Sequence, residues 1–140
     1  MQERLKLLGT LATRGEIKAK SERLTALVLA LPNAQDAYDR AKASLAAQER
    51  LLGEREDILV GAVEGKNAEA RRVALLVAKQ GDRDWQQLLN IVNTVRGQVL
   101  DAGLALERVK REWAVLTVQI HIFTATLGFL AGANEKQEGE

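Results

Sequence analysis

A seven-residue repeat of apolar side chains runs without interruption through the C-terminal part of the chain. Counting Trp85 as position a, seven consecutive heptads carry only apolar residues at a and d: Trp85, Leu88, Val92, Val95, Val99, Ala102, Leu106, Val109, Trp113, Leu116, Ile120, Phe123, Leu127 and Leu130. Such a repeat predicts one long α-helix whose apolar stripe packs against another helix along its whole length. An exposed stripe of this size would make the chain aggregate, so a partner helix must cover it.

The composition agrees with a chain built from long helices. There is one proline and no cysteine, which excludes disulfide frameworks and thiolate metal sites. Lys and Arg number 20 against 19 Asp and Glu, so the net charge of +1 gives no overall attraction to nucleic acid or membrane. Charged residues interrupt every apolar run near the N-terminus, which predicts no signal peptide and a cytoplasmic location.

Apolar spacing and capping residues divide the rest of the chain into helices, and no segment has the period of two that predicts a strand. Pro32 and Asn33 are predicted to end one helix and begin the next. Asn67 and Asp82 are predicted N-caps. The expected helices cover residues 2–13, 16–31, 34–63 and 68–80, followed by the heptad helix. Their expected packing faces are Tyr38, Leu45, Leu52 and Leu59 in the third and Val73, Leu76 and Val77 in the fourth.

Short connections between helices favour antiparallel neighbours. The sequence therefore predicts an all-α fold: an antiparallel helical hairpin or coiled coil with a long C-terminal heptad helix, which forms oligomers. The expected regions are N-terminal helices at 1–31, the hairpin with its oligomerisation helix at 33–133, and a mobile polar tail at 134–140.

The C-terminal part of the heptad helix has two apolar faces. Residues 113–133 carry no formal charge, and Val115, Ile122 and Phe129 form a second stripe beside the first. Two readings stay open, the buried centre of a homo-oligomer and a transmembrane helix, for which about 20 apolar residues suffice. The oligomer reading assigns the contacts between chains to Trp113, Leu116, Ile120, Phe123, Leu127 and Leu130.

The sequence offers few parts for catalysis. The run from Gly61 to Asn67 differs from a phosphate-binding loop in its spacing and lacks the Ser or Thr that would hold magnesium. His121 is the only histidine and has no neighbouring carboxylate on its face of the helix, so we expect it to be a packing or interface residue. We predict no enzymatic activity, no cofactor and no metal site.

Basic residues gather around the predicted tip of the hairpin, at Lys66, Arg71, Arg72, Lys79 and Arg83. Scattered charges of this kind are usually a solvated helix face, whereas phosphate binding needs several cations on one surface. Oligomers would multiply a small basic patch, and Trp85 or Tyr38 would offer stacking faces if they were exposed.

The run Gly65-Lys66-Asn67 with Arg71 and Leu75 resembles a Gly-Lys-Asn-x-x-x-Arg-x-x-x-Leu pattern at the hairpin tip of small helical phage and prophage proteins. In size and helical layout the chain is also similar to phage recombination mediators of the UvsY type. The resemblance implies an oligomer that binds single-stranded DNA, together with recombination or replication proteins as partners. It implies nucleic-acid contacts at Lys66, Asn67, Arg71, Arg72 and Lys79, with Asn67 capping the helix that presents the cations.

The sequence thus predicts a non-enzymatic oligomeric accessory protein of phage-type DNA replication or recombination. Two other classes stay open. One is a coiled-coil protein anchored in a membrane by its C-terminal helix, and the other is a structural or scaffold coiled coil without a nucleic-acid role.

Overall fold

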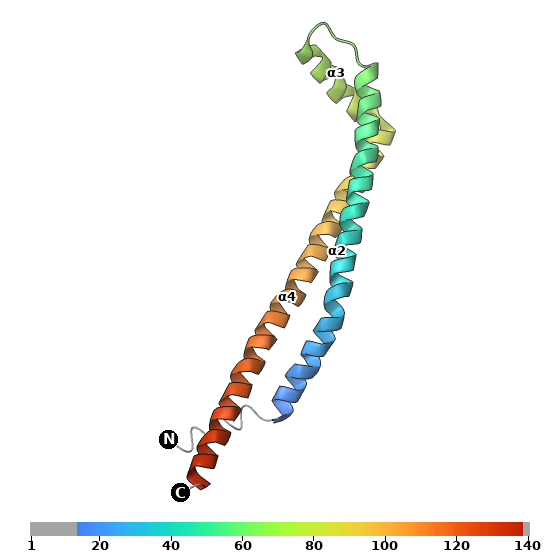
Figure 1. Cartoon of the computed structure of the whole chain (residues 1–140). Helices are drawn as coiled ribbons and strands as arrows, with labels where there is room; N and C mark the ends of the chain where they lie inside the picture. The colour runs from blue at the N-terminus through green and yellow to red at the C-terminus, as the bar shows by residue number, and fades with distance from the viewer. Residues whose placement is uncertain (1–13, 139–140) are drawn as a thin grey trace. The chain divides into compact units, whose positions relative to one another are not determined.

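The computed structural model describes the backbone of residues 14–138 and the side chains of residues 15–132, and this part of the chain contains three α-helices and no strand. Figure 1 labels them α2 (Arg14–Ala62), α3 (Ala68–Gly81) and α4 (Arg83–Glu138). The predicted all-α hairpin is therefore confirmed, whereas its oligomerisation stays a prediction. The helix predicted at residues 2–13 lies outside the described residues.

The chain divides into two compact units, each built from one segment of α2 and one of α4. Unit 1 contains residues 1–34 and 106–140, and unit 2 contains residues 35–105, including α3. The sequence instead predicted three consecutive regions at 1–31, 33–133 and 134–140, and this division stays a prediction.

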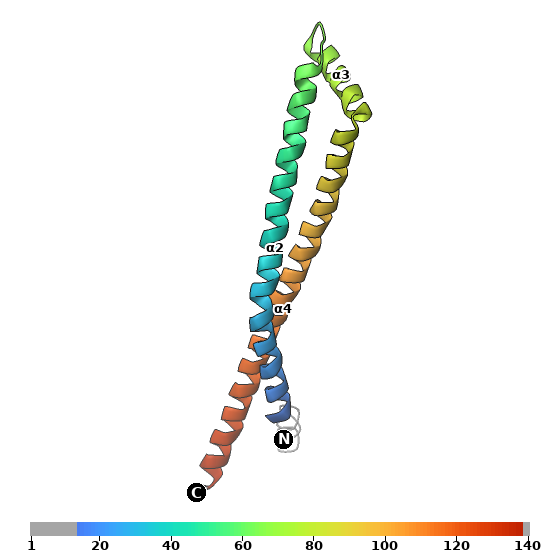
Figure 2. The same cartoon turned by 90° about the vertical axis from the view of Figure 1, so that its right-hand side faces the viewer.

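Unit 2 is an antiparallel helical hairpin in which α3 joins the ends of α2 and α4 (Figures 1 and 2). Two pairs far apart in sequence fix its register. A Cβ added at Gly103 would lie 3.3 Å from Cε2 of Tyr38, and Nη2 of Arg96 donates to Oε1 of Glu49 over 3.2 Å. The residue numbers of the α4 partners fall as those of α2 rise, so the two segments run in opposite directions.

The heptad stripe is the core of unit 2, as the sequence predicts. Val92 is fully buried and Val95 nearly so. On α2 the predicted row is half-buried: Tyr38, Leu45, Leu52 and Leu59. A single seam of apolar side chains along both helices thus holds this hairpin together.

The start of α4 is tied to α2 by an ion pair. Arg55 donates from Nε and Nη2 to the carboxylate of Asp82, both over 2.7 Å, and Asp82 also caps α4 by accepting from the backbone N–H of Trp85 over 3.0 Å. The hydrogen bond from Arg55 is the main reason that the pKa of Asp82 lies below its ordinary value. The predicted caps at Asn67 and Asp82 are both confirmed.

Unit 1 is a second antiparallel helix pair, which the sequence pattern did not predict. Its α2 segment packs on the apolar part of α4: the Arg23 guanidinium donates to Glu112 over 2.6 Å and 3.0 Å, and Lys20 Nζ donates to Gln119 over 2.9 Å. Its buried apolar side chains are Leu27, Leu106 and Leu116. One of the two apolar faces beyond Trp113 is therefore partly covered by α2 of the same chain.

The predicted helix break at Pro32 is wrong, because α2 continues through this residue. Proline lacks an N–H, so the carbonyl of Val28 loses its helical donor. Val28, Pro32 and Asn33 are all exposed, so water can hydrate this carbonyl and the ring meets no neighbouring helix. The proline does lie close to the division between the units, which falls after Ala34.

The backbone of α4 extends to Glu138, into the polar tail predicted at 134–140, which stays a prediction. A helix that is already formed can continue through residues of good helix propensity without packing of its own.

Candidate functional site

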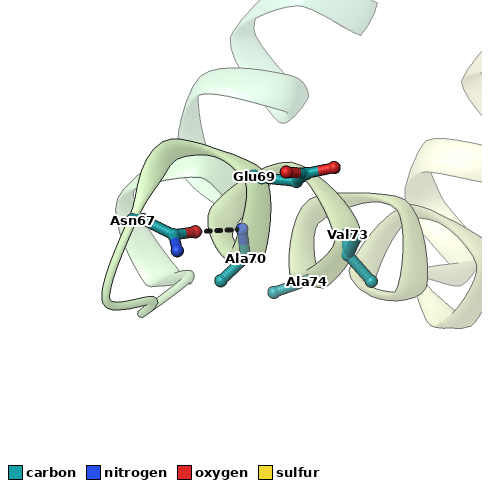
Figure 3. A pocket seen from close by; sticks show the side chains of 5 residues that line it. All are labelled: Asn67, Glu69, Ala70, Val73 and Ala74. Atoms are coloured by element: carbon teal, nitrogen blue, oxygen red, sulfur yellow. Dashed lines mark hydrogen bonds between the residues drawn. The ribbon is translucent and has the colours of Figure 1, made fainter.

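The tip of unit 2 is a five-residue connection, 63–67, followed by α3. Asn67 has an extended backbone, with φ −145° and ψ 173°, and its Oδ1 accepts from the N–H of Ala70 over 2.8 Å (Figure 3). This N-cap hydrogen bond satisfies one of the four free amides at the start of α3.

Gly65 lies against the first turn of α3 in a contact that leaves no space for a side chain. A Cβ at this position would lie 2.8 Å from both the backbone N and Cγ of Arg71. Arg71 in turn donates from Nε to the carbonyl of Asn67 over 3.4 Å. Gly65, Asn67 and Arg71, three residues of the Gly-Lys-Asn-x-x-x-Arg run, thus interact with one another and build the turn.

Lys66, Arg71 and Arg72 are the exposed cations of this tip. Lys66 and Arg72 make no hydrogen bond or ion pair with any residue that the structure describes, and the terminal amino groups of Arg71 are likewise without a partner there. The neighbouring Glu64 and Glu69 are exposed as well and reduce the local charge. Three cations without an ion pair are therefore presented within one connection and the first two turns of α3.

Lys79, the fifth residue assigned to nucleic-acid binding, has a different environment. Its Nζ donates to Oε1 of Glu56 over 2.7 Å and lies 5.3 Å from the centre of the Trp85 ring, and its side chain is mostly buried. The structure thus brings four of the five predicted residues together at the tip and places Lys79 in an interhelical ion pair.

Trp85 and Tyr38, the two aromatic side chains expected to offer stacking faces if exposed, are both half-buried. Trp85 is half-buried beneath Lys79, and its Nε1 is buried without a hydrogen-bond partner in the described chain. Tyr38 is half-buried beside Gly103, with Lys42 Nζ 4.5 Å from its ring centre. A lysine Nζ thus lies over each ring, and neither ring is fully exposed.

The predicted packing face of α3 is wrong. Val73, Leu76 and Val77 are more than half exposed, whereas Leu75, Ala78 and Lys79 form the half-buried side. A shallow, open pocket lies over Asn67, Glu69, Ala70, Val73 and Ala74 on the exposed side (Figure 3). An apolar surface therefore adjoins the cations of the tip.

The residues assigned to oligomer contacts are partly covered within unit 1. Leu116 is buried, Trp113 is 40% exposed, and the others are half-buried: Ile120, Phe123, Leu127 and Leu130. His121 is exposed. Contacts between chains through these residues stay a prediction.

No group of three or more metal-binding side chains occurs in the part of the chain that the structure describes. No protein-family model, curated protein or solved structure matches this chain. The fold and the geometry of the tip therefore carry the functional argument.

Proposed function

We propose that this chain is a non-enzymatic, self-associating helical accessory protein of phage-type DNA replication or recombination that binds single-stranded DNA through its tip. The observation that supports this function best is the group of unpaired, exposed cations at Lys66, Arg71 and Arg72. Asn67 contributes by capping α3 and so fixing the backbone that carries them. Lys79 is left out because Glu56 holds it.

The contacts would be electrostatic and indifferent to base sequence. Each cation that neutralises a phosphate releases a counterion, so affinity falls as salt rises. The connection and the start of α3 carry only three such cations beside Glu64 and Glu69, and the exposed Arg83 lies beyond the other end of α3, so a single chain has too few for tight binding. Self-association would bring several tips to one strand and raise the avidity without new contacts.

Fluorescence anisotropy with a labelled oligonucleotide tests this function. We expect the unaltered chain to bind single-stranded DNA at low salt, with weaker binding as salt is added. The triple variant Lys66→Ala/Arg71→Ala/Arg72→Ala should lose affinity, and its slope of log affinity against log salt should fall by about two.

A matched control removes the same charge elsewhere in unit 2. Arg40, Lys42 and Arg50 are exposed on α2 and contact only residues of the same helix, including Tyr38 beneath Lys42, so their triple alanine variant should keep most of the affinity. Equal losses in both triple variants would mean that net charge alone governs binding, and no binding at low salt would reject the DNA role.

A second candidate function is that of a structural scaffold without a nucleic-acid role. The contacts among Gly65, Asn67 and Arg71 favour this scaffold function. These residues build the turn, so their presence in the sequence is accounted for without a bound ligand. A chain that self-associates but binds no single-stranded DNA would support this second function.

Membrane anchoring is the third candidate. Within the described residues, α4 contains one segment that is long and apolar enough to cross a bilayer by length and composition, and little of it is buried. Helices of this length and composition also occur in soluble assemblies. The charged side chains of α2 that pack against α4 in unit 1 therefore bear on whether its partner is lipid or protein.

A further inference from the structure

An exposed row of apolar side chains runs along the outer side of α4 in unit 1. We call it the outer stripe and define it as Val115, Val118, Ile122, Ala125 and Phe129. Val115, Val118, Ile122 and Phe129 are 54%, 57%, 56% and 70% exposed. The inner seam of the same helix, in contrast, contains the buried Leu106 and Leu116.

We infer that the outer stripe is the surface on which a second copy of this chain packs, with the two α4 helices antiparallel about Ile122. This inference deepens the self-association within the proposed function and is independent of DNA binding.

The spacing of the outer stripe is that of a helix–helix seam. Its members recur at intervals of three and four residues, so they repeat the a and d positions of a second heptad. A surface that faces lipid needs apolar residues but no such period. Ala125 lies within the stripe and Gly128 beside it, and small residues allow two helices to approach closely.

Charged residues in unit 1 argue against lipid as the occupant. Lys20 reaches the apolar part of α4, where its Nζ donates to Gln119 and lies 5.7 Å from the centre of the Phe123 ring. Arg23 pairs with Glu112 beside it. Insertion of α4 into a bilayer would draw Lys20 into the hydrocarbon or break unit 1, and a charge at the bilayer centre costs at least about 2.5 kcal/mol.

Charge also selects the antiparallel direction. Arg108 and Arg111 continue the outer stripe one heptad before Val115 and Val118, so in a parallel pair each arginine would meet its own copy. In an antiparallel pair centred on Ile122 the two basic ends lie about 40 Å apart at 1.5 Å per residue. Each then adjoins the negative C-terminal end of the partner helix, where residues 134–140 carry a sequence charge of −2.

Such a pair is symmetric, because the same surface is used on both copies. Ile122 lies at the twofold axis and meets its own copy. Val115 lies seven residues to one side and meets Phe129 of the other copy.

Disulfide cross-linking tests this arrangement directly, because the chain has no cysteine of its own. A disulfide requires Cα atoms within about 7 Å. Ile122→Cys should therefore cross-link to itself under mild oxidation, whereas Val115→Cys alone should not. A mixture of Val115→Cys and Phe129→Cys chains should give the mixed dimer.

Sedimentation of the full chain in detergent-free buffer supplies a second test. Ile122→Lys should shift the protein towards monomer at concentrations where the unaltered chain is dimeric. Thr124→Lys is the matched control, because this exposed residue lies off the outer stripe, and it should leave the dimer intact. Circular dichroism checks that both variants stay helical.

The outcomes separate this inference from the proposed function. Cross-linking of Val115→Cys to itself would overturn the antiparallel pair and keep self-association. A monomer at all concentrations would overturn both the pair and the proposed self-association. A chain that partitions into phosphatidylcholine vesicles, with Ile122→Lys abolishing that partition, would assign the stripe to lipid and overturn the inference.

Discussion

Arg55 and Asp82 form a two-point ion pair in which both N–O distances are 2.7 Å. Because the same carboxylate accepts the backbone N–H of Trp85, one side chain both caps α4 and attaches its first turn to α2. Asp82 also stands directly after Gly81, the last residue of α3, so it lies where the three helices of unit 2 meet.

This double role predicts a graded response to substitution at Asp82. Asp82→Asn keeps an oxygen that can cap α4 but loses the charge, whereas Asp82→Ala loses both the cap and the ion pair. The urea midpoint of unfolding should fall in the order unaltered chain, Asp82→Asn, Asp82→Ala. Equal midpoints for the two variants would show that the cap contributes nothing.

The ion pairs also predict loss of stability in acid. Hydrogen bonds from Arg55 and Arg23 hold the pKa values of Asp82 and Glu112 below their ordinary values of 3.8 and 4.5. The folded chain therefore binds fewer protons than the unfolded chain, so this stability is present above the ordinary pKa values and is lost as the pH falls from them through the lower pKa values of the folded chain.

Thermal unfolding followed from about pH 7 to about pH 3 measures this effect. The midpoint should fall most steeply at the acidic end. Asp82→Asn/Glu112→Gln should show a shallower fall, and an unchanged profile would contradict the assignment.

Two glycines in unit 2 should respond to alanine with opposite signs. Gly53 lies inside α2, away from both helix ends, with nothing within 4 Å of an added Cβ, so Gly53→Ala should raise the free energy of unfolding by about 0.5–1 kcal/mol. Gly65→Ala would place its Cβ against the backbone of Arg71 and should lower it. Chemical denaturation of the two variants side by side tests this contrast, which equal shifts would refute.

Substitutions at Asn67 separate the effect of the N-cap on stability from the effect of charge on DNA binding. Asn67→Ala should lower stability by about 1 kcal/mol through loss of the N-cap. Asn67→Asp should keep the cap but weaken DNA binding, since it adds a negative charge beside Lys66. The two variants are compared by urea unfolding and by anisotropy; unchanged DNA affinity in Asn67→Asp would count against phosphate contacts at the tip.

Two leucines of α4, Leu104 and Leu106, test which side of this helix is buried. Leu106 is buried in unit 1, so Leu106→Ala should cost about 2–5 kcal/mol. Leu104 is more than half exposed, and Leu104→Ala should change stability by less than about 0.5 kcal/mol. Similar losses measured in urea for both variants would indicate that the outer side of α4 is covered as well.

The helices and their ends followed closely from the sequence where local chemistry decides them. The period of α4 identified the seam that buries Val92 and Val95, and the side chains of Asn67 and Asp82 marked two helix starts. These signals are local, because a cap or a heptad is complete within a few turns of one helix.

The sequence-based predictions were wrong where the burial of a residue depends on a neighbouring helix. α3 has apolar residues on two sides, and its pattern alone does not say which side is buried. Contacts of Lys79 with Glu56 and Trp85 turn Leu75 inwards and leave Val73 exposed.

Pro32 caused the second error, because the expected break hid the partner of the C-terminal apolar segment. With α2 continuous, its first residues lie beside α4, and Leu27 becomes part of the core of unit 1. Exposure of Val28 and Pro32, which decides whether the helix tolerates proline, depends on this packing.

The register of unit 2 limits which insertions and deletions its two paired helices can accept. Tyr38 lies beside Gly103 and Glu49 binds Arg96, so the α2 segment of unit 2 is aligned with one particular stretch of α4. A single residue inserted into one helix would rotate everything beyond it by about 100° and move the seam off its partner. Longer or shorter relatives should therefore differ by whole heptads, gained or lost in both helices together.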